Sequence, residues 1–407
     1  MNKTEERFAK KPKNETLKHI NLVKSTFFHE KETKKKLINF IRHSNILSMN
    51  VKCLEFEKSY AEYMNQKYSV LFNSGSSANL AIIQTFLNLG YIKKGDKIAF
   101  SALTWATNVM PIIQLGLIPI PIDVEIDTLN VSSKTLQNTL DTNSDIKMFF
   151  ISNILGFCDD IDKIKEICDN RKIYFIEDNC ESIGSIYKGK KLGSFGIAST
   201  MSFYVGHHLS AIEGGIVSTN NDDIFNMLQM VRSHGWDRCL DKNTKKSLQK
   251  KYKIDEFYDK YTFYEVGYNL RPTEITGFLA LVALEYIDEI VKKREKNFWA
   301  FNNEIKNSCD IVKLRVDNLD VISNFAFPLI FKERKAFEIY KNRFMESEIE
   351  IRPIVGGNMV NQPFFKKYFN FKYILPISNL IHANGFYFPN NPELNEEEIQ
   401  RILNILR

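Results

Sequence analysis

Two adjacent histidines, His207 and His208, stand in a glycine-flanked turn between two short apolar segments. Because the ordinary pKa of histidine is about 6.5, an imidazole in such a turn can remove a proton and return it at working pH. An acid, Asp178, directly follows another apolar segment. It can pair with a protonated ring nitrogen of a ligand or cap the next helix, and these residues alone leave both interpretations open.

A run of small polar residues, NSGSSAN at 73–79, comes directly after the apolar segment 68–72. At the start of a helix, small residues let backbone N–H groups close around a phosphate, which the positive end of the helix dipole also favours. Serine and asparagine are equally common as plain helix N-caps. The run therefore predicts either a phosphate site or an ordinary helix start.

Short apolar segments alternate with helix-like segments from about residue 68 onward. This alternation predicts an α/β domain with a mostly parallel sheet that helices cover on both faces. In such sheets ligands bind at the carboxyl ends of the strands, where the residues above are placed. The expected strands are 68–72, 97–101, 117–122, 147–152, 172–177, 200–204 and 215–219.

The second half of the chain predicts a smaller α+β domain. Residues 274–295 have the apolar spacing of one long amphipathic helix that ends in a basic turn. After it, we expect strands at 322–329, 348–352 and 386–388, and a closing helix at 395–406. The expected division is an N-terminal helical segment at 1–50 that packs beside the small domain, a large domain at 51–280 and the small domain at 281–407, with a mobile loop at 237–255.

The composition is that of an ordinary folded protein, because 44% hydrophobic and 26% charged residues in a chain of 407 exclude disorder and fibrous repeats. The net charge of +6 is scattered, so nucleic acid is not an expected partner. Residues 1–19 lack the apolar core of a secretory signal, and prolines break the uncharged run 98–122 into strand and helix lengths. Six cysteines without a C-x-x-C pair predict reduced thiols and no metal site. We therefore expect a cytoplasmic protein outside the membrane.

Four ordered blocks resemble one known family. They are GSSANL at 75–80, EDNCESIGSIYKGKKLGSFG at 177–196, SFYVGHHLSAIEGG at 202–215 and GYNLRPTEITG at 267–277. Over almost its whole length the chain is similar to the DegT/DnrJ/EryC1/StrS family of vitamin B6-dependent sugar aminotransferases and dehydratases. The resemblance implies the aspartate aminotransferase-like fold (fold type I), with a large mixed, mostly parallel sheet domain and a smaller α+β C-terminal domain.

The same resemblance implies a site for pyridoxal 5′-phosphate or its amine form, pyridoxamine 5′-phosphate. The implied contacts are Gly75, Ser76 and Ser202 at the phosphate, Trp105 stacked on the ring, Asp178 at the ring nitrogen, Glu181 near the ring hydroxyl, and Asn269 reaching the phosphate from the other subunit of a homodimer. For the substrates, a nucleotide-diphosphate sugar and L-glutamate, we consider His234, Arg271 and Arg352, because both ligands need fixed donors. Each of these three can equally be a surface or domain-bridging residue.

One position departs from the aminotransferases of the family. Where those enzymes have the lysine that binds the cofactor covalently, this chain has His207. Histidine cannot form that bond, but it can move a proton at the cofactor C4′ carbon. Within the family this substitution is typical of sugar 3-dehydratases. The phrases FYVGHHLSAIEGG and RPIVGGN resemble the cluster-free type that acts on GDP-4-keto-6-deoxymannose.

The resemblance therefore implies a lyase that removes the C3 oxygen of a GDP-linked 4-keto-6-deoxy sugar, uses L-glutamate as amino donor and releases ammonia and 2-oxoglutarate. Such dideoxy sugars belong to lipopolysaccharide O-antigen or capsule. The first alternative is a nucleotide-sugar aminotransferase with Lys188 or Lys190 in place of the usual lysine. A cluster-dependent dehydratase, which needs cysteines such as Cys180 and Cys239, and a non-catalytic scaffold are the others. The nucleotide, GDP or CDP, and the sugar, hexose or heptose, stay open.

Overall fold

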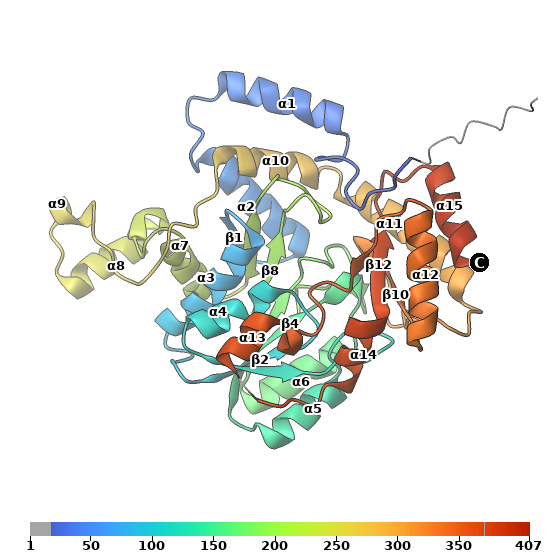
Figure 1. Cartoon of the computed structure of the whole chain (residues 1–407). Coiled ribbons are helices and arrows are strands. Elements are labelled where there is room, and N and C mark those ends of the chain that lie inside the picture. The colour runs from blue at the N-terminus through green and yellow to red at the C-terminus, as the bar shows by residue number, and fades with distance from the viewer. Residues whose placement is uncertain (1–17, 370) are drawn as a thin grey trace, which may run out of the picture.

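The computed structural model describes residues 18–369 and 371–407. Residues 1–17 lie outside the described residues. These residues include most of the segment 1–19, in which we expect no secretory signal, and the first part of the expected N-terminal helical segment 1–50. Figure 1 gives the arrangement of the described helices and strands.

A seven-stranded sheet forms the centre of the larger part of the molecule (Figure 1). The expected mostly parallel sheet is confirmed, since β9 alone among the seven runs against its neighbours. In order across the sheet, the strands are β1 (Tyr68–Phe72), β9 (Gly215–Thr219), β8 (Ala198–Ser202), β5 (Tyr174–Asp178), β4 (Ile146–Ser152), β2 (Lys97–Ser101) and β3 (Ile118–Ile122). The bounds of β1, β2 and β9 are those expected from the apolar runs.

The strands are buried on both faces, which explains why they read as continuous apolar runs. Side chains alternate between two cores: Phe150 packs on one face of the sheet and Phe149 on the other. One face is covered by α3 (Gly75–Asn88), α4 (Met110–Gln114) and α7 (Asp222–Arg232), and the other by α2 (Val51–Met64), α5 (Ser133–Thr142), α6 (Ile161–Arg171) and α10 (Glu274–Leu284). As expected, the uncharged run 98–122 forms β2, a 3-10 turn at Ala106–Asn108, α4 and β3. None of the helices within the described residues is long and apolar enough to cross a membrane.

A three-stranded antiparallel sheet lies in the smaller part of the molecule. Its order is β10 (Ala326–Ile330), β12 (Gly385–Pro389) and β11 (Arg352–Pro353). The helices of this half are α11 (Ile287–Ile305), α12 (Arg334–Glu346), α13 (Pro363–Tyr368), α14 (Pro376–Asn384) and α15 (Glu396–Leu406). The strand expected at 348–352 is wrong in extent, because the residues that pair with β12 are Arg352 and Pro353.

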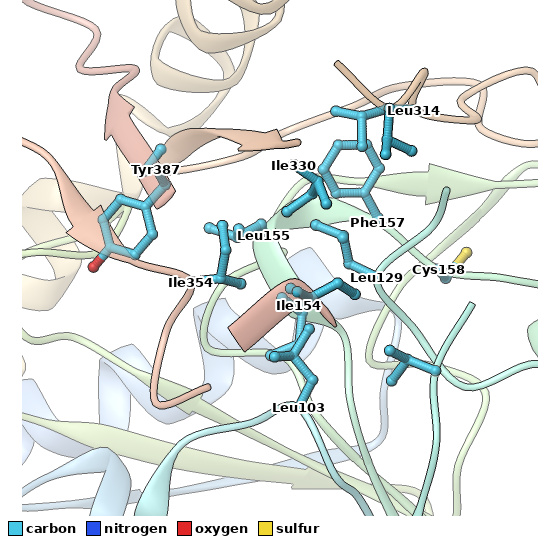
Figure 2. Packing of buried hydrophobic residues seen from close by; sticks show 14 of the residues in the cluster. Leu103, Leu129, Ile154, Leu155, Phe157, Cys158, Leu314, Ile330, Ile354 and Tyr387 are labelled. Carbon is cyan, nitrogen blue, oxygen red and sulfur yellow. The ribbon is translucent and has the colours of Figure 1, made fainter. Parts of the chain in front are cut away.

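One hydrophobic cluster joins the two parts of the molecule (Figure 2). It includes Leu103 after β2 and Leu155 after β4, together with Ile354 and Tyr387 of the smaller part. Because these side chains share one core, moving the two parts away from each other would expose apolar surface to water. The cluster therefore fixes the walls of any site that lies between the parts.

The described N-terminal segment contacts both parts. Ile20 forms a short parallel bridge with Ile349, and Lys24 pairs with Glu398 of α15. The helix α1 (Glu30–His43) instead lies over α10 (Figure 1). The expected packing beside the small domain thus holds for the segment before α1 and not for α1 itself. The expected domain limits at 50/51 and 280/281 stay predictions.

The single helix expected at 274–295 is wrong, because two helices, α10 and α11, meet at Glu285 and Tyr286. The Tyr286 N–H donates to the Ala283 carbonyl oxygen (3.1 Å), which closes a tight turn. Lys36 of α1 pairs with Glu285 (2.9 Å), and the ring of His29 packs against that of Tyr286. These stabilising contacts come from a distant segment of the chain, so apolar periodicity could not indicate the break.

The mobile loop expected at 237–255 is also wrong, because most of it is α8 (Lys242–Tyr252), which α9 (Glu256–Asp259) follows. Asp241 caps α8 by accepting from the N–H groups of Asn243 and Thr244 (2.8 and 3.2 Å). No residue of α8 is buried, so the segment has no apolar stripe from which a helix could be predicted. Both helices project from the side of the molecule (Figure 1).

Candidate active site

A cavity of about 310 Å³ lies at the carboxyl ends of the parallel strands, between the large sheet and the smaller part of the molecule. Most residues selected from the sequence line it: Gly75, Ser76, Trp105, Asp178, Glu181, Ser202, His207 and Arg352. Three others, His234, Asn269 and Arg271, are not among the described residues that line it.

One region of the cavity can bind an anion. Ser74 caps α3 by accepting from the Ser77 N–H (3.0 Å), and the first turn leaves the Gly75 and Ser76 N–H groups without partners inside the helix. Ser202 ends β8 directly against this turn, since a Cβ on Gly75 would lie 2.5 Å from the Ser202 Cβ. Glycine permits this approach, which brings the helix N-terminus, its free N–H groups and the Ser202 hydroxyl together.

Asp178 ends β5 and is held by three donors. Its Oδ2 accepts from the side-chain amides of Asn79 (3.0 Å) and Asn108 (2.7 Å), and its Oδ1 accepts from the Cys180 N–H (2.9 Å). Charge-assisted hydrogen bonds of this kind are short and directional. They fix the direction in which the carboxylate faces the cavity, where it can pair with a protonated ring nitrogen.

Glu181 is a buried acid in the cavity wall, and its Oε2 accepts from the Leu155 N–H (2.9 Å). Burial, with a smaller contribution from the Asp178 carboxylate, raises the pKa of Glu181 to about 8. At neutral pH the Glu181 side chain is therefore mainly protonated. Its O–H group can then donate a hydrogen bond to a ligand.

Leu155 reaches Glu181 because its backbone adopts the left-handed conformation (φ 50°). This conformation costs a residue with a side chain about 1 kcal/mol. The Leu155 side chain is fully buried in the cluster that includes Ile154 and Ile354 (Figure 2). Packing therefore holds the strained turn and keeps its N–H group directed at the site.

His207 lies in the turn after β8, and its ring is centred 5.8 Å from that of Phe325. Burial is the largest cause that lowers the pKa of His207, to about 4; the Asp178 carboxylate opposes this effect and the Arg294 guanidinium adds to it. Burial also lowers the pKa of the neighbouring His208. Both rings are neutral at pH 7, the form in which an imidazole nitrogen accepts a proton.

Trp105 and Arg352 complete the lining. The Trp105 side chain is 55% exposed, so its indole face is open to a flat ligand. Arg352 donates through Nε and Nη2 to Glu350 Oε1 (2.9 and 2.6 Å), and Glu350 Oε2 accepts from the Leu22 N–H (2.8 Å). One carboxylate thus connects the N-terminal segment to the arginine of the cavity wall.

The three remaining residues selected from the sequence form an exposed group. Asn269 Oδ1 accepts from Arg271 Nε (3.0 Å), and the His234 N–H donates to the Tyr268 carbonyl oxygen (2.7 Å). The Asn73 N–H donates to the carbonyl oxygen of Leu270 (3.0 Å), which places this group beside the anion-binding turn. The geometry of a single chain assigns them no role in its own cavity.

Sequence reasoning missed Asn79, Asn108 and Leu155 as residues of the site. Asn79 lies in the small-residue run, which predicts a phosphate site or a helix start but not a donor to Asp178. Asn108 lies in a 3-10 turn, and Leu155 takes a backbone conformation unusual for leucine. Neither leaves a signal in the sequence, because both act on groups that only the fold brings close.

The fold and the site together define an aspartate aminotransferase-like protein, and the fold class expected from the resemblance is confirmed. The sequence pattern of the DegT/DnrJ/EryC1/StrS aminotransferase family matches residues 29–407. The chain belongs to this family.

Three similar proteins bear on the function. GDP-4-keto-6-deoxy-D-mannose 3-dehydratase of Yersinia pseudotuberculosis is 32% identical over 390 residues, covering 94% of this chain and 97% of that protein. The structure of the E. coli GDP-4-keto-6-deoxy-D-mannose-3-dehydratase with bound hydrated PLP has a TM-score of 0.86 at 28% identity, covering 96% of this chain and 100% of that one. A structure of GDP-4-keto-6-deoxymannose-3-dehydratase with a trapped PLP-glutamate geminal diamine has a TM-score of 0.85 at 28% identity, covering 95% and 100%.

Substitution of Asn108 by leucine tests the network around Asp178. We expect Asn108→Leu to raise the dissociation constant of pyridoxal phosphate at least about tenfold, because the carboxylate loses a donor that fixes its direction. Absorbance titration with the cofactor measures this. Asn138→Leu, at an exposed position of α5, is the control. Equal affinities of the two variants would contradict the assigned role.

The raised pKa of Glu181 predicts a pH-dependent stability. Between the ordinary value of 4.5 and about 8, the folded state keeps a proton that the unfolded state releases. The free energy of unfolding therefore falls as pH rises through this window. We expect Glu181→Gln to be more stable than the parent by at least about 1 kcal/mol at pH 8 and nearly equal to it at pH 5.

Urea unfolding of the cofactor-free protein at both pH values measures the Glu181 effect. The control is Glu346→Gln, at an exposed position of α12, which should leave the pH dependence unchanged. A Glu181→Gln variant that is less stable than the parent at pH 8 would show that the buried group is charged.

Proposed function

We propose that the chain is a lyase that removes the C3 oxygen of a GDP-linked 4-keto-6-deoxy sugar, with L-glutamate as amino donor and ammonia and 2-oxoglutarate as products. The oxygen lost by the sugar balances the oxygen gained when glutamate becomes 2-oxoglutarate, so no further reductant is needed. One observation carries the proposal: a neutral histidine, His207, lines the cavity, and no lysine is among the described residues that do so. The similar proteins named above carry this activity in their names.

The cavity fits pyridoxal 5′-phosphate or pyridoxamine 5′-phosphate. The supporting observation is the close approach of Gly75 to Ser202, which leaves N–H and hydroxyl donors where a Cβ would otherwise stand. The proposed contacts are Gly75, Ser76 and Ser202 at the phosphate, Asp178 at the ring nitrogen, Trp105 on the ring face and Glu181 at the ring hydroxyl. With no lysine in the described lining, these contacts would hold the cofactor without a covalent bond.

When bound, the cofactor would supply an amine suited to the C4 ketone of the sugar and a conjugated ring able to take up electrons from its C4′ carbon. His207 removes the proton at C4′, since its ring is neutral at working pH. The imidazole of His207, which now carries this proton, then donates it to the departing C3 hydroxyl group. Asp178 keeps the ring nitrogen protonated, and Arg352 binds a carboxylate or phosphate of the substrates.

A nucleotide-sugar aminotransferase is the alternative, and it needs a lysine at the cofactor. Lys188 pairs with Asp162 (2.7 Å) in the turn between β6 (Ile186–Tyr187) and β7 (Lys190–Lys191). The Lys190 ammonium lies over the ring of Phe195, 4.6 Å from its centre. Neither lysine lines the cavity, so the geometry favours the dehydratase.

We also propose a homodimer in which Asn269 contacts the phosphate site of the partner, with His234 and Arg271 beside it. In support, Asn269 is exposed beside the anion-binding turn and yet does not line the cavity of its own chain. Exposed apolar side chains on α1 and α2 that a second subunit could cover are Ile38, Ile41, Val51 and Leu54.

The cytoplasm is the compartment that we propose for this reaction. All six cysteines are free thiols, and Cys53, Cys158 and Cys168 are buried. Free thiols persist in reducing compartments. The proposed product, a nucleotide-linked dideoxy sugar, suits the synthesis of bacterial surface polysaccharide.

Product analysis tests the reaction. With pyridoxal phosphate, L-glutamate and GDP-4-keto-6-deoxymannose, we expect 2-oxoglutarate, ammonia and a keto sugar that is lighter by the mass of one oxygen. His207→Asn should lower the turnover about 10²- to 10⁴-fold, since the base is lost. His43→Asn, on the exposed side of α1, is the control. A product with an amino group on the sugar would identify an aminotransferase, and no glutamate-dependent conversion would refute catalysis.

Mixing of inactive variants tests the shared site. In a dimer of one His207→Asn and one Asn269→Ala subunit, one of the two sites combines an intact His207 with the intact Asn269 of the partner. We therefore expect random mixing to restore roughly a quarter of the parental activity. If each chain completed its own site, mixing would restore none.

A further inference from the structure

A second, smaller cavity of about 40 Å³ lies behind His207. The His207 ring lines this cavity and the active-site cavity, so it stands between the two. The other polar residues around the second cavity are Ser25, Thr26, Thr33, His208, Ser210, Arg294, Asn391 and Glu393. A space with such a lining suits a polar occupant.

Four buried nitrogens of the surrounding residues have no hydrogen-bond partner in the described part of the chain. They are His207 Nδ1, both ring nitrogens of His208 and Arg294 Nε. A buried polar atom without a partner is rare, because the lost hydration is not offset. Their concentration around one small polar space indicates that bound water completes their hydrogen bonds.

Arg294 supports this interpretation. Its Nη1 donates to the carbonyl oxygens of Phe325 (2.9 Å) and Asn390 (2.5 Å), and the residue is 4% exposed. Glu393 lines the same cavity and its carboxylate attracts the guanidinium. Water is the usual bridge where polar groups face each other across such a gap. The Glu393 carboxylate also disfavours an anion in this space.

We propose that about one or two water molecules occupy the second cavity and link His207 Nδ1 to Arg294 and Glu393, which fixes the ring with its hydrogen on Nδ1 and a free lone pair on Nε2. His208 and Arg294 are then positioning residues for the base. This inference rests on the proposed function of His207.

The hydrogen-bond requirements of a neutral imidazole explain the arrangement. One ring nitrogen carries the hydrogen and the other accepts, so a base that acts through Nε2 must carry its hydrogen on Nδ1. The Nδ1 atom is the buried one. If it carries the hydrogen, as we propose, it needs an acceptor. A water molecule can accept from Nδ1–H and from Arg294 Nε–H and can donate to the Glu393 carboxylate.

Charged and titratable groups face His207 from both cavities. In the main cavity they are Asp178 at the end of β5, Tyr204 in the same turn as His207, and Cys180, Glu181, Glu213, Arg352 and Tyr387 in the lining. Around the second cavity they are His208, Arg294 and Glu393. Burial is the main cause that lowers the pKa of His207, and Arg294 adds to it, whereas the Asp178 carboxylate and the Ser202 backbone raise the pKa. The proposed water therefore lies on the side of the His207 ring where Arg294 disfavours protonation of the ring.

Nitrogen NMR of the parental holoenzyme tests the proposal without a variant in the sample. The protein is labelled with ¹⁵N-histidine, and the His207 signals are assigned by their loss in His207→Asn. We expect hydrogen on Nδ1 and none on Nε2 from pH 6 to 8. Hydrogen on Nε2 would overturn the proposal.

A matched pair of variants at Ala283, which also lines the second cavity, tests the role of the water. Ala283→Val adds two methyl groups and displaces water without changing a charge. Ala283→Ser adds one hydroxyl group that can join the hydrogen bonds. We expect the valine variant to lose the preference for hydrogen on Nδ1 and to turn over at least about tenfold more slowly, while the serine variant retains the parental spectrum and rate. Equal spectra for the two variants would overturn the proposal.

Crystals of the holoenzyme soaked in bromide distinguish water from an anion. We expect density for water in the second cavity and no anomalous signal, whereas a bromide peak there would overturn the proposal. Neither the spectra nor the crystals depend on turnover. A parental enzyme with hydrogen on Nδ1 but no dehydration would therefore refute the proposed function and leave this inference intact.

Discussion

Burial of the cavity lining decides the protonation state of the groups that face it. Away from water the charged form of a side chain is costly, so Glu181 keeps a proton and His207 does without one at neutral pH. Asp178 is buried as well, but three donors surround its oxygens. One donor acid and one free base thus arise from the same physical cause, and hydrogen bonds fix the direction of the Asp178 side chain beside them.

The fold produces this burial by close approach of backbone segments. Because Gly75 has no Cβ, the first turn of α3 packs against the end of β8. Leu155 adopts a strained backbone conformation in which its N–H donates to Glu181. Both arrangements depend on the cores around them. The cluster that joins the two parts of the molecule holds Leu155 in place and closes one wall of the cavity with Tyr387 (Figure 2). Core packing and site geometry are therefore coupled, and a cavity made in this cluster would also move a donor.

Sequence reasoning predicted what local pattern encodes. Buried parallel strands leave continuous apolar runs, so the bounds of β1, β2 and β9 followed from the sequence, as did the gathering of His207 and Asp178 at the carboxyl edge of the sheet. Three other features did not follow from the sequence. They are the break between α10 and α11, the solvated helix α8 and the hydrogen bond from the Asn108 amide. Each depends on contacts between distant segments or on a helix without an apolar stripe, which periodicity does not register.

The resemblance to the family implies that His207 stands where its aminotransferases have a lysine, and this would change what the surroundings of position 207 must do. A lysine that binds the cofactor covalently is positioned by that bond. A histidine has no such bond, so its position and its protonation must come from the protein alone. The side chains behind His207 provide a hydrogen-bonding environment. Burial and Arg294 oppose protonation of the ring, whereas Asp178 favours it. In the proposed chemistry, a base without a covalent anchor needs a structural one, and the side chains around the second cavity can supply it.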